Sequence, residues 1–340
     1  MRIASALKHL SGRLGLLLVS LVLLTYLALA LAPFRWVPPR RSANAAVIGT
    51  AGLTFSAPGL ARTRAAPAWL EQAAEHGRLH LELRLRTYDP ERRRLGRIFT
   101  VSRDYHFRNL TLDQDGPDLV LRLRRPGSTP NGKPLYRLAG VLGDTGWHEV
   151  EVVITPGRLR VALDGRVALT TTLPERPLVD WDRRYLVALG NELNGNLPWQ
   201  GEVARAVVEV GGERVDYASP GILELPEQFW AFGNRPTWLF EDYVYPHSIE
   251  DWITNFASFI PLGFLLAALG GRRGSWRRAL VVCAVASLVV ELAQGFFSRH
   301  PATMDWVLNT LGGGAGAVMA QWLVNRAPEN TTAADERTAH

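Results

Sequence analysis

The residues whose types could do chemistry are polar side chains at the ends of apolar segments in the C-terminal part of the chain. They are carboxylates, amides and one arginine: Asp251, Asn255, Glu291, Gln294, Arg299, Asp305 and Asn309. Three pairs among them are spaced i, i+3 or i, i+4, which places both members on one face of a helix. A carboxylate inside a membrane is costly unless it is paired, protonated or facing a wet cavity. We therefore expect these residues to converge in one outward-facing pocket, which either binds a ligand or ties the helices together by hydrogen bonds.

Acid–base catalysis is an alternative role for this cluster. Glu291 and Asp305 would then act as acid and base, because partial burial raises the pKa of a carboxyl group. No nucleophile–histidine–aspartate arrangement accompanies them, and a single cysteine, Cys283, excludes a multi-cysteine metal site. The sequence favours binding over catalysis and predicts neither a metal site nor a cofactor here.

Four apolar segments position the polar cluster. Residues 14–34, 252–271, 279–290 and 306–325 contain no charged residue. A run of about 20 residues crosses a ~30 Å hydrocarbon core at 1.5 Å per residue. We expect four transmembrane helices, at 14–34 and at about 252–271, 278–298 and 304–325. The first is longer than the usual core of a signal peptide, so we expect it to be retained as an anchor.

The formal net charge of +6 indicates topology rather than nucleic-acid binding. Residues 35–250 hold 28 Lys and Arg against 26 Asp and Glu, so most of the excess lies elsewhere. Nine of the other ten basic residues flank the apolar segments on one side, where cytoplasmic loops collect Lys and Arg. Residues 1–13 and the tail 326–340, expected to be disordered, are therefore predicted inside, and residues 35–250 outside. The chain is predicted to be a multi-pass protein of a cytoplasmic membrane with no nucleic-acid partner.

The large outer insert is predicted to be a β-sandwich over residues 48–217, after a linker at 35–47. Apolar and polar residues alternate over 79–86, 119–124 and 149–154, which is typical of strands with one buried face. Turn residues such as Asp164-Gly165 separate them, and helical crossovers are absent from the pattern. The fold class is therefore mixed: an α-helical membrane bundle of four helices plus an extracytoplasmic all-β antiparallel sandwich.

Three segments of this sandwich share a recognisable pattern. Gly146-Trp147-His148 begins one strand, residues 157–165 form a strand that ends in an Asp-Gly turn, and Trp199-Gln200-Gly201 begins a late strand. The pattern is similar to that of laminin-G-like, concanavalin-type jelly rolls. This resemblance implies a jelly roll with Trp147 and Trp199 in or beside its core. It leaves function open, since such domains bind glycans, proteins or calcium, or act as spacers.

One loop of the sandwich is a candidate binding rim. It carries four polar residues between two late strands: Asn191, Glu192, Asn194 and Asn196. Oxygen ligands of this kind suit a sugar or Ca²⁺, whereas a solvated turn rich in Asn and Gly is the interpretation that we favour. Glycoside hydrolysis needs two carboxylates that face each other across a cleft. Glu149 and Glu151 share one strand face, and we interpret them as its solvated side.

The C-terminal motifs resemble those of the VanZ-like family. Asp251-x3-Asn255 is followed by Phe259-Ile260-Pro261-Leu262-Gly263-Phe264, then by Glu291-x2-Gln294, Arg299 and Asp305-x3-Asn309-x2-Gly312. The resemblance covers residues 251–325 and implies a bacterial cytoplasmic-membrane protein, with a role in glycopeptide (teicoplanin-type) resistance as one family precedent. The family usually joins its first two spans by a short segment, and here some 200 residues intervene.

An aromatic segment joins the sandwich to the C-terminal spans. Residues 218–250 are rich in Trp and Tyr, which prefer the membrane–water interface. We expect this connector to lie along the outer membrane surface, with an extra strand of the sandwich as the alternative. Taken together, the sequence predicts an envelope protein that binds membrane lipids and a glycan or lipid-linked cell-wall precursor. A membrane enzyme acting on such an intermediate is the alternative.

Overall fold

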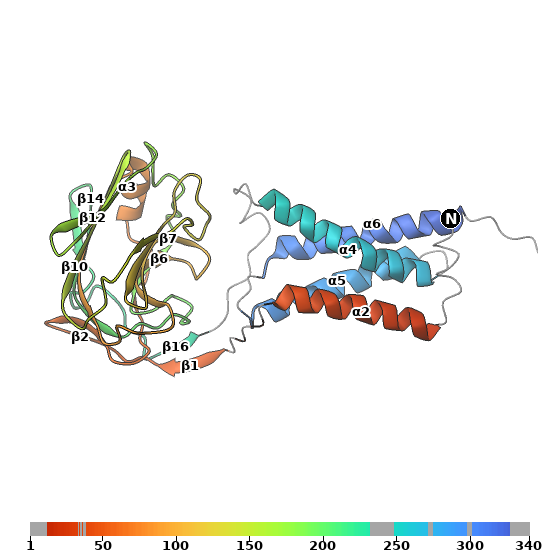
Figure 1. Ribbon diagram of the computed structural model, residues 1–340, viewed down its shortest axis with the longest axis horizontal. Helices are drawn as coiled ribbons and strands as arrows, with labels where there is room; N and C mark the ends of the chain where they lie inside the picture. The colour runs from red at the N-terminus through yellow and green to blue at the C-terminus, as the bar shows by residue number, and fades with distance from the viewer. Residues whose placement is uncertain are drawn as a thin grey trace, which may run out of the picture. The chain divides into compact units, whose positions relative to one another are not determined.

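The chain divides into two compact units. The computed structural model describes residues 12–32, 34, 36, 39–231, 248–270, 275–297 and 301–326. Val37–Asn234 form one unit, and Met1–Trp36 with Arg235–His340 form the other. The first unit is an antiparallel β-sandwich and the second is helical (Figure 1). The predicted all-β insert is therefore confirmed.

Two sheets form the layers of the sandwich (Figure 1). The larger has the order β12-β11-β10-β5-β14-β3-β2, with β15 paired to β14. Its strands are β2 (Ala46–Gly49), β3 (Gly52–Phe55), β5 (Leu79–Thr87), β10 (His148–Thr155), β11 (Arg158–Leu163), β12 (Arg166–Thr172), β14 (Gly201–Val210) and β15 (Glu213–Asp216). The smaller has the order β4-β13-β6-β7-β8-β9. Its strands are β4 (Ala61–Arg62), β6 (Gly96–Ser102), β7 (Arg108–Asp115), β8 (Asp118–Leu123), β9 (Tyr136–Leu138) and β13 (Leu186–Leu189).

Alternating leucines build the core between the sheets. In β5, residues 79, 81, 83 and 85 are leucines that are at most 2% exposed, while the residues between them are polar. Full burial of one such side chain contributes about 1.5–3 kcal/mol. The short helix α3 (Trp69–His76) adds Trp69 to the core, and its Nε1 donates a 2.7 Å hydrogen bond to Tyr217 Oη. Period-2 patterning thus translates directly into one buried and one polar face.

The two tryptophans expected in or beside the core have different environments. Trp199 is fully buried and donates from Nε1 to Gln114 Oε1 at 2.8 Å, as predicted. Trp147 is 36% exposed, and the guanidinium groups of Arg84 and Arg86 lie over its ring. The prediction for Trp147 is therefore wrong. Arginines covering an indole face provide a cation–π environment at the surface instead of a place in the core.

Strands also occur in two segments predicted to be irregular. β1 (Arg40–Ala43) lies in the predicted linker and pairs antiparallel with β16 (Gln228–Ala231), which lies in the predicted connector. Phe229 of β16 is buried against Leu60 and Ala188. For this part of the connector the strand interpretation holds rather than the membrane-surface one. Residues 232–247, which complete the connector, lie outside the described residues.

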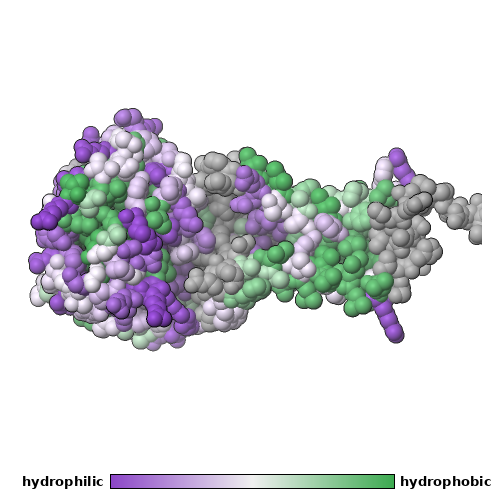
Figure 2. All heavy atoms as spheres, viewed as in Figure 1, coloured by the Kyte–Doolittle hydropathy of each residue, from purple (hydrophilic) through white to green (hydrophobic). Residues whose placement is uncertain are grey.

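The described residues of the other unit form four long helices. They are α2 (Gly12–Leu31), α4 (Ser248–Gly270), α5 (Ser275–Gln294) and α6 (Thr303–Asn325). Two of the described helices qualify as membrane spans by length and composition, at Arg13–Leu31 and Ile249–Gly270. Spanning by all four helices stays a prediction. Hydrophobic side chains nevertheless cover much of the visible helical surface (Figure 2), and α5 and α6 expose apolar residues such as Val281 and Val318.

Glycines allow α4 and α6 to pack backbone against backbone. A Cβ atom on Gly312 would lie 1.9 Å from the carbonyl oxygen of Phe256, and one on Gly263 would lie 1.8 Å from that of Gly313. No other residue fits at these contacts without moving a helix. Small residues permit this close approach in membrane helices, so the glycine-rich stretch of α6 serves packing.

We predict that residues 39–231 fold when they are expressed alone, because their core and their β1–β16 pair are complete within this segment. Far-UV circular dichroism should show β-structure with one cooperative thermal transition. A shorter fragment, residues 45–218, lacks β1 and β16 and should melt at a lower temperature, since Leu60 and Ala188 lose Phe229 as a partner. A helical spectrum, or equal melting temperatures for the two fragments, would contradict this.

Candidate functional site

The structure describes six of the seven residues of the predicted membrane pocket, and Arg299 lies outside the described residues. Glu291, Gln294 and Asn309 are buried, whereas Asn255 and Asp305 are half-buried. Asp251 is exposed at the first turn of α4. The convergence of all seven residues in one pocket stays a prediction.

The buried members of this set tie helices together. Glu291 Oε2 accepts a 2.8 Å hydrogen bond from the backbone N–H of Ala302, just before α6, where the helix dipole favours negative charge. Gln294 Nε2 donates to the carbonyl oxygen of Ala30 at 3.3 Å, and Asn309 Nδ2 donates to Ser287 Oγ at 3.0 Å. These contacts support the structural interpretation for Glu291, Gln294 and Asn309, since each joins different segments of the unit.

The loop from Asn191 to Asn196 is folded into the sandwich. Asn191, Glu192 and Asn194 are at most 1% exposed, and Asn196 is half-buried. Asn191 Oδ1 accepts hydrogen bonds from the backbone N–H groups of Glu192 and Leu197, at 2.9 and 3.0 Å. The favoured prediction of a solvated turn is therefore wrong, because these side-chain bonds turn the loop inward onto the smaller sheet.

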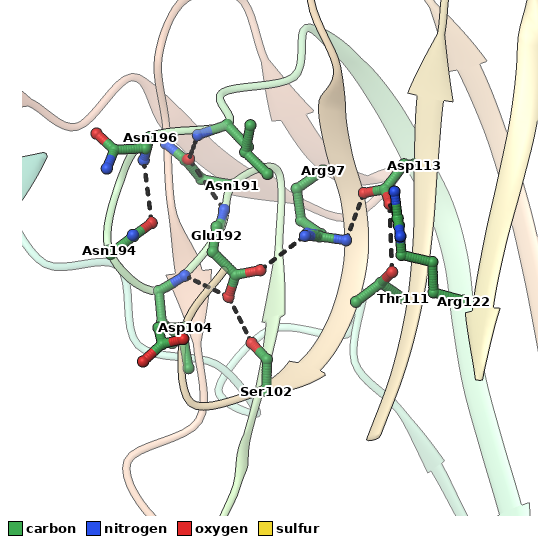
Figure 3. Close-up of polar contacts among 12 residues, drawn as sticks. Arg97, Ser102, Asp104, Thr111, Asp113, Arg122, Asn191, Glu192, Asn194 and Asn196 are labelled. Carbon is green, nitrogen blue, oxygen red and sulfur yellow. Dashed lines mark hydrogen bonds and ion pairs between the residues drawn. The ribbon is translucent and has the colours of Figure 1, made fainter. Parts of the chain in front are cut away.

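An ion-pair network lies beneath this loop (Figure 3). Arg97 Nη2 lies 2.9 Å from Glu192 Oε2 in an ion pair, and Arg97 Nη1 lies 2.5 Å from Asp113 Oδ1. Ser102 Oγ and the backbone N–H of Leu193 donate to Glu192 Oε1, and Thr111 Oγ1 donates to Asp113 Oδ2 at 3.2 Å. The side chains of Arg97, Asp113 and Glu192 are completely buried, so one guanidinium bridges two carboxylates away from solvent.

Strand register brings the network together. Arg97 of β6 pairs with Asp113 of β7, and Thr111 of β7 pairs with Arg122 of β8. Further along β6 and β7, Ser102 pairs with Arg108. Every residue of β6 is buried, so both faces of this strand are covered. One face carries core residues such as Phe99 and Val101, and the other contributes to the polar network.

Burial dominates the electrostatics of this network. Burial, and after it the neighbouring Arg97 charge, lower the pKa of Arg108 to about 9, although the carboxylates of Glu192 and Asp113 oppose this. Burial likewise raises the pKa of Asp113, while the three arginines oppose that rise. The network contains Arg97, Arg108 and Arg122 against Asp113 and Glu192, which gives a formal charge of +1.

Some buried hydrogen-bond donors in this part of the sandwich have no acceptor within the described residues. Within the described part of the chain, several buried donor atoms have no hydrogen-bond partner, among them Thr100 Oγ1, Asn191 Nδ2, Asn194 Nδ2, Arg122 Nε and all three guanidinium nitrogens of Arg108. Buried polar groups are normally satisfied. Acceptor oxygens are what these donors lack.

Sequence reasoning missed Arg97, Arg108, Asp113 and Arg122. Their sequence signal is a charged residue inside an otherwise β-forming run, as in Arg97-Ile98-Phe99-Thr100-Val101. Such a residue is normally assigned to a solvated strand face, and only the burial of both faces shows otherwise.

The other chemical possibilities weighed from the sequence find less support. Glu149 is exposed on β10, and Glu151 pairs with Arg160 and with His80 at 3.1 Å on the polar face of the larger sheet. Among the described residues, no group of three or more His, Cys, Asp or Glu side chains could hold a metal ion. The polar network of the smaller sheet is therefore the candidate site.

Comparison with known proteins gives a family match for the C-terminal part of the chain. Residues 215–324 match the VanZ/LLP1 family model, which confirms the resemblance of the C-terminal motifs. No curated protein matches the chain. A SAP-like pentraxin from Limulus polyphemus is similar in structure, with 12% identity, a TM-score of 0.36, and coverage of 54% of this chain and 97% of that chain.

Two further structures are similar to this chain. The CBM40 of a Ruminococcus gnavus IT-sialidase bound to α2,3-sialyllactose has 13% identity, a TM-score of 0.35, and coverage of 50% of this chain and 94% of that chain. Domains LG4-5 of the mouse laminin α1 chain have 17% identity and a TM-score of 0.30, with coverage of 54% of this chain and 47% of that chain.

We predict that Glu192→Ala lowers the free energy of unfolding of the sandwich by about 3–5 kcal/mol, because it leaves the buried charges of Arg97, Arg108 and Arg122 with Asp113 as their one carboxylate in the network. Glu175→Ala is the matched control, since Glu175 is exposed; its effect should stay within about 0.5 kcal/mol. Urea denaturation followed by tryptophan fluorescence measures both. Equal stabilities of the two variants would show that the Arg97–Glu192 pair contributes nothing to folding.

Proposed function

Because residues 215–324 match the VanZ/LLP1 family, we propose that this chain is a multi-pass protein of the bacterial cytoplasmic membrane whose external sandwich binds a glycan. The helices anchor the protein, with both termini in the cytoplasm. The sandwich binds its ligand at the buried polar network and the Asn191–Asn196 loop of the smaller sheet.

The observation that carries this proposal is the set of unsatisfied donors in that network. Amide, hydroxyl and guanidinium groups converge there from β6, β7, β8 and the loop after β13. A few precisely placed polar groups in a protected place are typical of small-ligand sites. A partly satisfied buried network is otherwise costly, and the hydroxyl and ring oxygens of a sugar offer the missing acceptors.

The outward surface of the helices supports membrane insertion. Leu16 and Leu17 of α2 are 70% and 67% exposed, and Ile253 of α4 is 64% exposed. Large contiguous apolar surfaces mark membrane or partner contacts. The same character on α5 and α6 supports four spans, although their composition is more polar.

The ligand of the membrane part stays open to experiment. A lipid or a lipid-linked cell-wall precursor remains the predicted partner of the Glu291–Asp305 region, and glycopeptide resistance remains a prediction of the family resemblance. The enzymatic alternative, with Glu291 and Asp305 as acid and base, gains no support from the contact of Glu291 with a backbone amide.

Topology gives one test of the proposal. Alkaline phosphatase is active only after export, so a fusion after residue 231 should be active and a fusion after residue 326 should be inactive. Green fluorescent protein at the same two points is the complementary control, because it fluoresces only when it folds inside. An active phosphatase after residue 326 would overturn the four-span arrangement.

Glycan binding gives the second test. Asn194→Ala removes an Nδ2 donor that has no partner within the described residues, and also the Oδ1 acceptor of the 3.4 Å hydrogen bond from the Asn196 backbone N–H. It should weaken oligosaccharide binding by about two- to tenfold while the sandwich still folds. Gln228→Ala is the control, since Gln228 is an exposed amide of β16. Binding of the full-length protein in nanodiscs to an oligosaccharide array, followed by titration of the best ligand, measures both variants. Binding that Asn194→Ala leaves unchanged would place the glycan elsewhere.

A further inference from the structure

Arg108 is a buried cation without a hydrogen-bond partner. Its side chain is completely buried, and within the described residues its Nε, Nη1 and Nη2 atoms make no hydrogen bond. A guanidinium carries five N–H donors in a planar fork. The contact that Arg108 does make is with the Tyr105 ring, 5.1 Å from Cζ to the ring centroid. A ring face attracts the charge but leaves the in-plane donors unoccupied.

The carboxylates nearby are already bound by other groups. Asp113 is paired with Arg97 and accepts a hydrogen bond from Thr111. Glu192 is paired with Arg97 and accepts from Ser102 and Leu193. Neither is recorded in an ion pair or a hydrogen bond with Arg108. The network is thus short of one negative charge.

We propose that the cluster of Arg97, Arg108 and Arg122 is the binding site for one anionic group, a carboxylate or a phosphate, carried by the glycan. This inference rests on the proposed glycan-binding function and names the class of its ligand as acidic. A carboxylate brings the formal charge of the network from +1 to zero, and a phosphate monoester, with about −1.5 to −2 at pH 7, makes it slightly negative.

The geometry of the donors fits such a group. A carboxylate or phosphate accepts two parallel N–H bonds from the fork of an arginine, and these charge-assisted bonds are about twice as strong as neutral ones. Arg122 adds Nε and Nη1, which also have no hydrogen-bond partner within the described residues. A neutral sugar fills the donors but leaves the buried positive charge uncompensated.

The cluster meets solvent at its edge. The Arg122 side chain is 12% exposed, and Tyr105 and His106 in the β6–β7 connection are half-buried. An anionic group that enters here displaces the Tyr105 ring from Arg108. The rest of the sugar then lies against the Asn191–Asn196 loop.

Substitution of Arg108 distinguishes a role in ligand binding from a role in folding. A buried cation kept for ligand binding costs stability in the empty protein, so Arg108→Met, which removes the charge and keeps the volume, should leave the melting temperature unchanged or raise it. Arg108→Lys keeps the charge and loses the fork. Arg166→Met is the matched control, because Arg166 is exposed on β12.

The experiment uses full-length protein in nanodiscs and an array of oligosaccharides in matched sets, each neutral glycan beside its uronic-acid and its sugar-phosphate counterpart. Wild type and Arg166→Met should bind an acidic member and not its neutral counterpart. Arg108→Met should bind it at least about tenfold more weakly, with Arg108→Lys in between. The uronic-acid and phosphate members show which anion the site takes.

Three outcomes overturn the inference, and one of them also overturns the proposed function. If acidic and neutral members bind equally and Arg108→Met changes nothing, the inference fails while glycan binding stands. If no oligosaccharide binds to wild type, both fail. A clear loss of melting temperature in Arg108→Met with unchanged ligand affinity also refutes the inference, because it assigns Arg108 to folding alone.

Discussion

The bridge from Arg97 to both Asp113 and Glu192 is the interaction on which the candidate site depends. Two carboxylates and a guanidinium buried together are tolerable only when each is paired and hydrogen-bonded, and Ser102, Thr111 and the Leu193 backbone complete that requirement. The bridge joins β6 and β7 to the loop after β13. It therefore fixes where the loop lies and keeps one face of the smaller sheet polar although it is buried.

The opposite face of the same strands offsets the desolvation cost of these buried charges. Phe99 and Val101 of β6 and Leu110 and Leu112 of β7 belong to one continuous hydrophobic core. Apolar burial on that side offsets the desolvation of charges on the other, because the two faces belong to the same hydrogen-bonded strands. Packing and polar specificity are thus divided between the two faces of one sheet.

Sequence patterns correctly predicted strands in which apolar and polar residues alternate with period 2. They did not predict the burial of charged residues in strands that are covered on both faces. β5 alternates leucines with polar residues, and its burial follows that alternation. β6 and β7 do not, so their charged residues resembled a solvated face. The Asn191–Asn196 loop was predicted as solvated because Asn and Gly are typical turn residues. Its burial depends on the pair between Glu192 and Arg97, which is remote in sequence. The prediction that Trp147 lies in or beside the core was wrong for a similar reason. Arg84 and Arg86, which lie over its ring, stabilise this indole at the surface.

One physical criterion separates structural polar groups from ligand-binding ones in this chain. In the helical unit, Glu291, Gln294 and Asn309 each bond to a protein group of another segment, which is what interhelical ties require. In the sandwich, Glu192 and Asp113 are both ion-paired with Arg97, whereas within the described residues the Arg108 guanidinium and the Asn191 and Asn194 amide nitrogens have no hydrogen-bond partner. A folded protein retains unsatisfied buried donors only at a cost. Selection for stability alone favours their removal, so the three unpaired nitrogens of Arg108 beside the Asn191 and Asn194 amides are the argument for a ligand there.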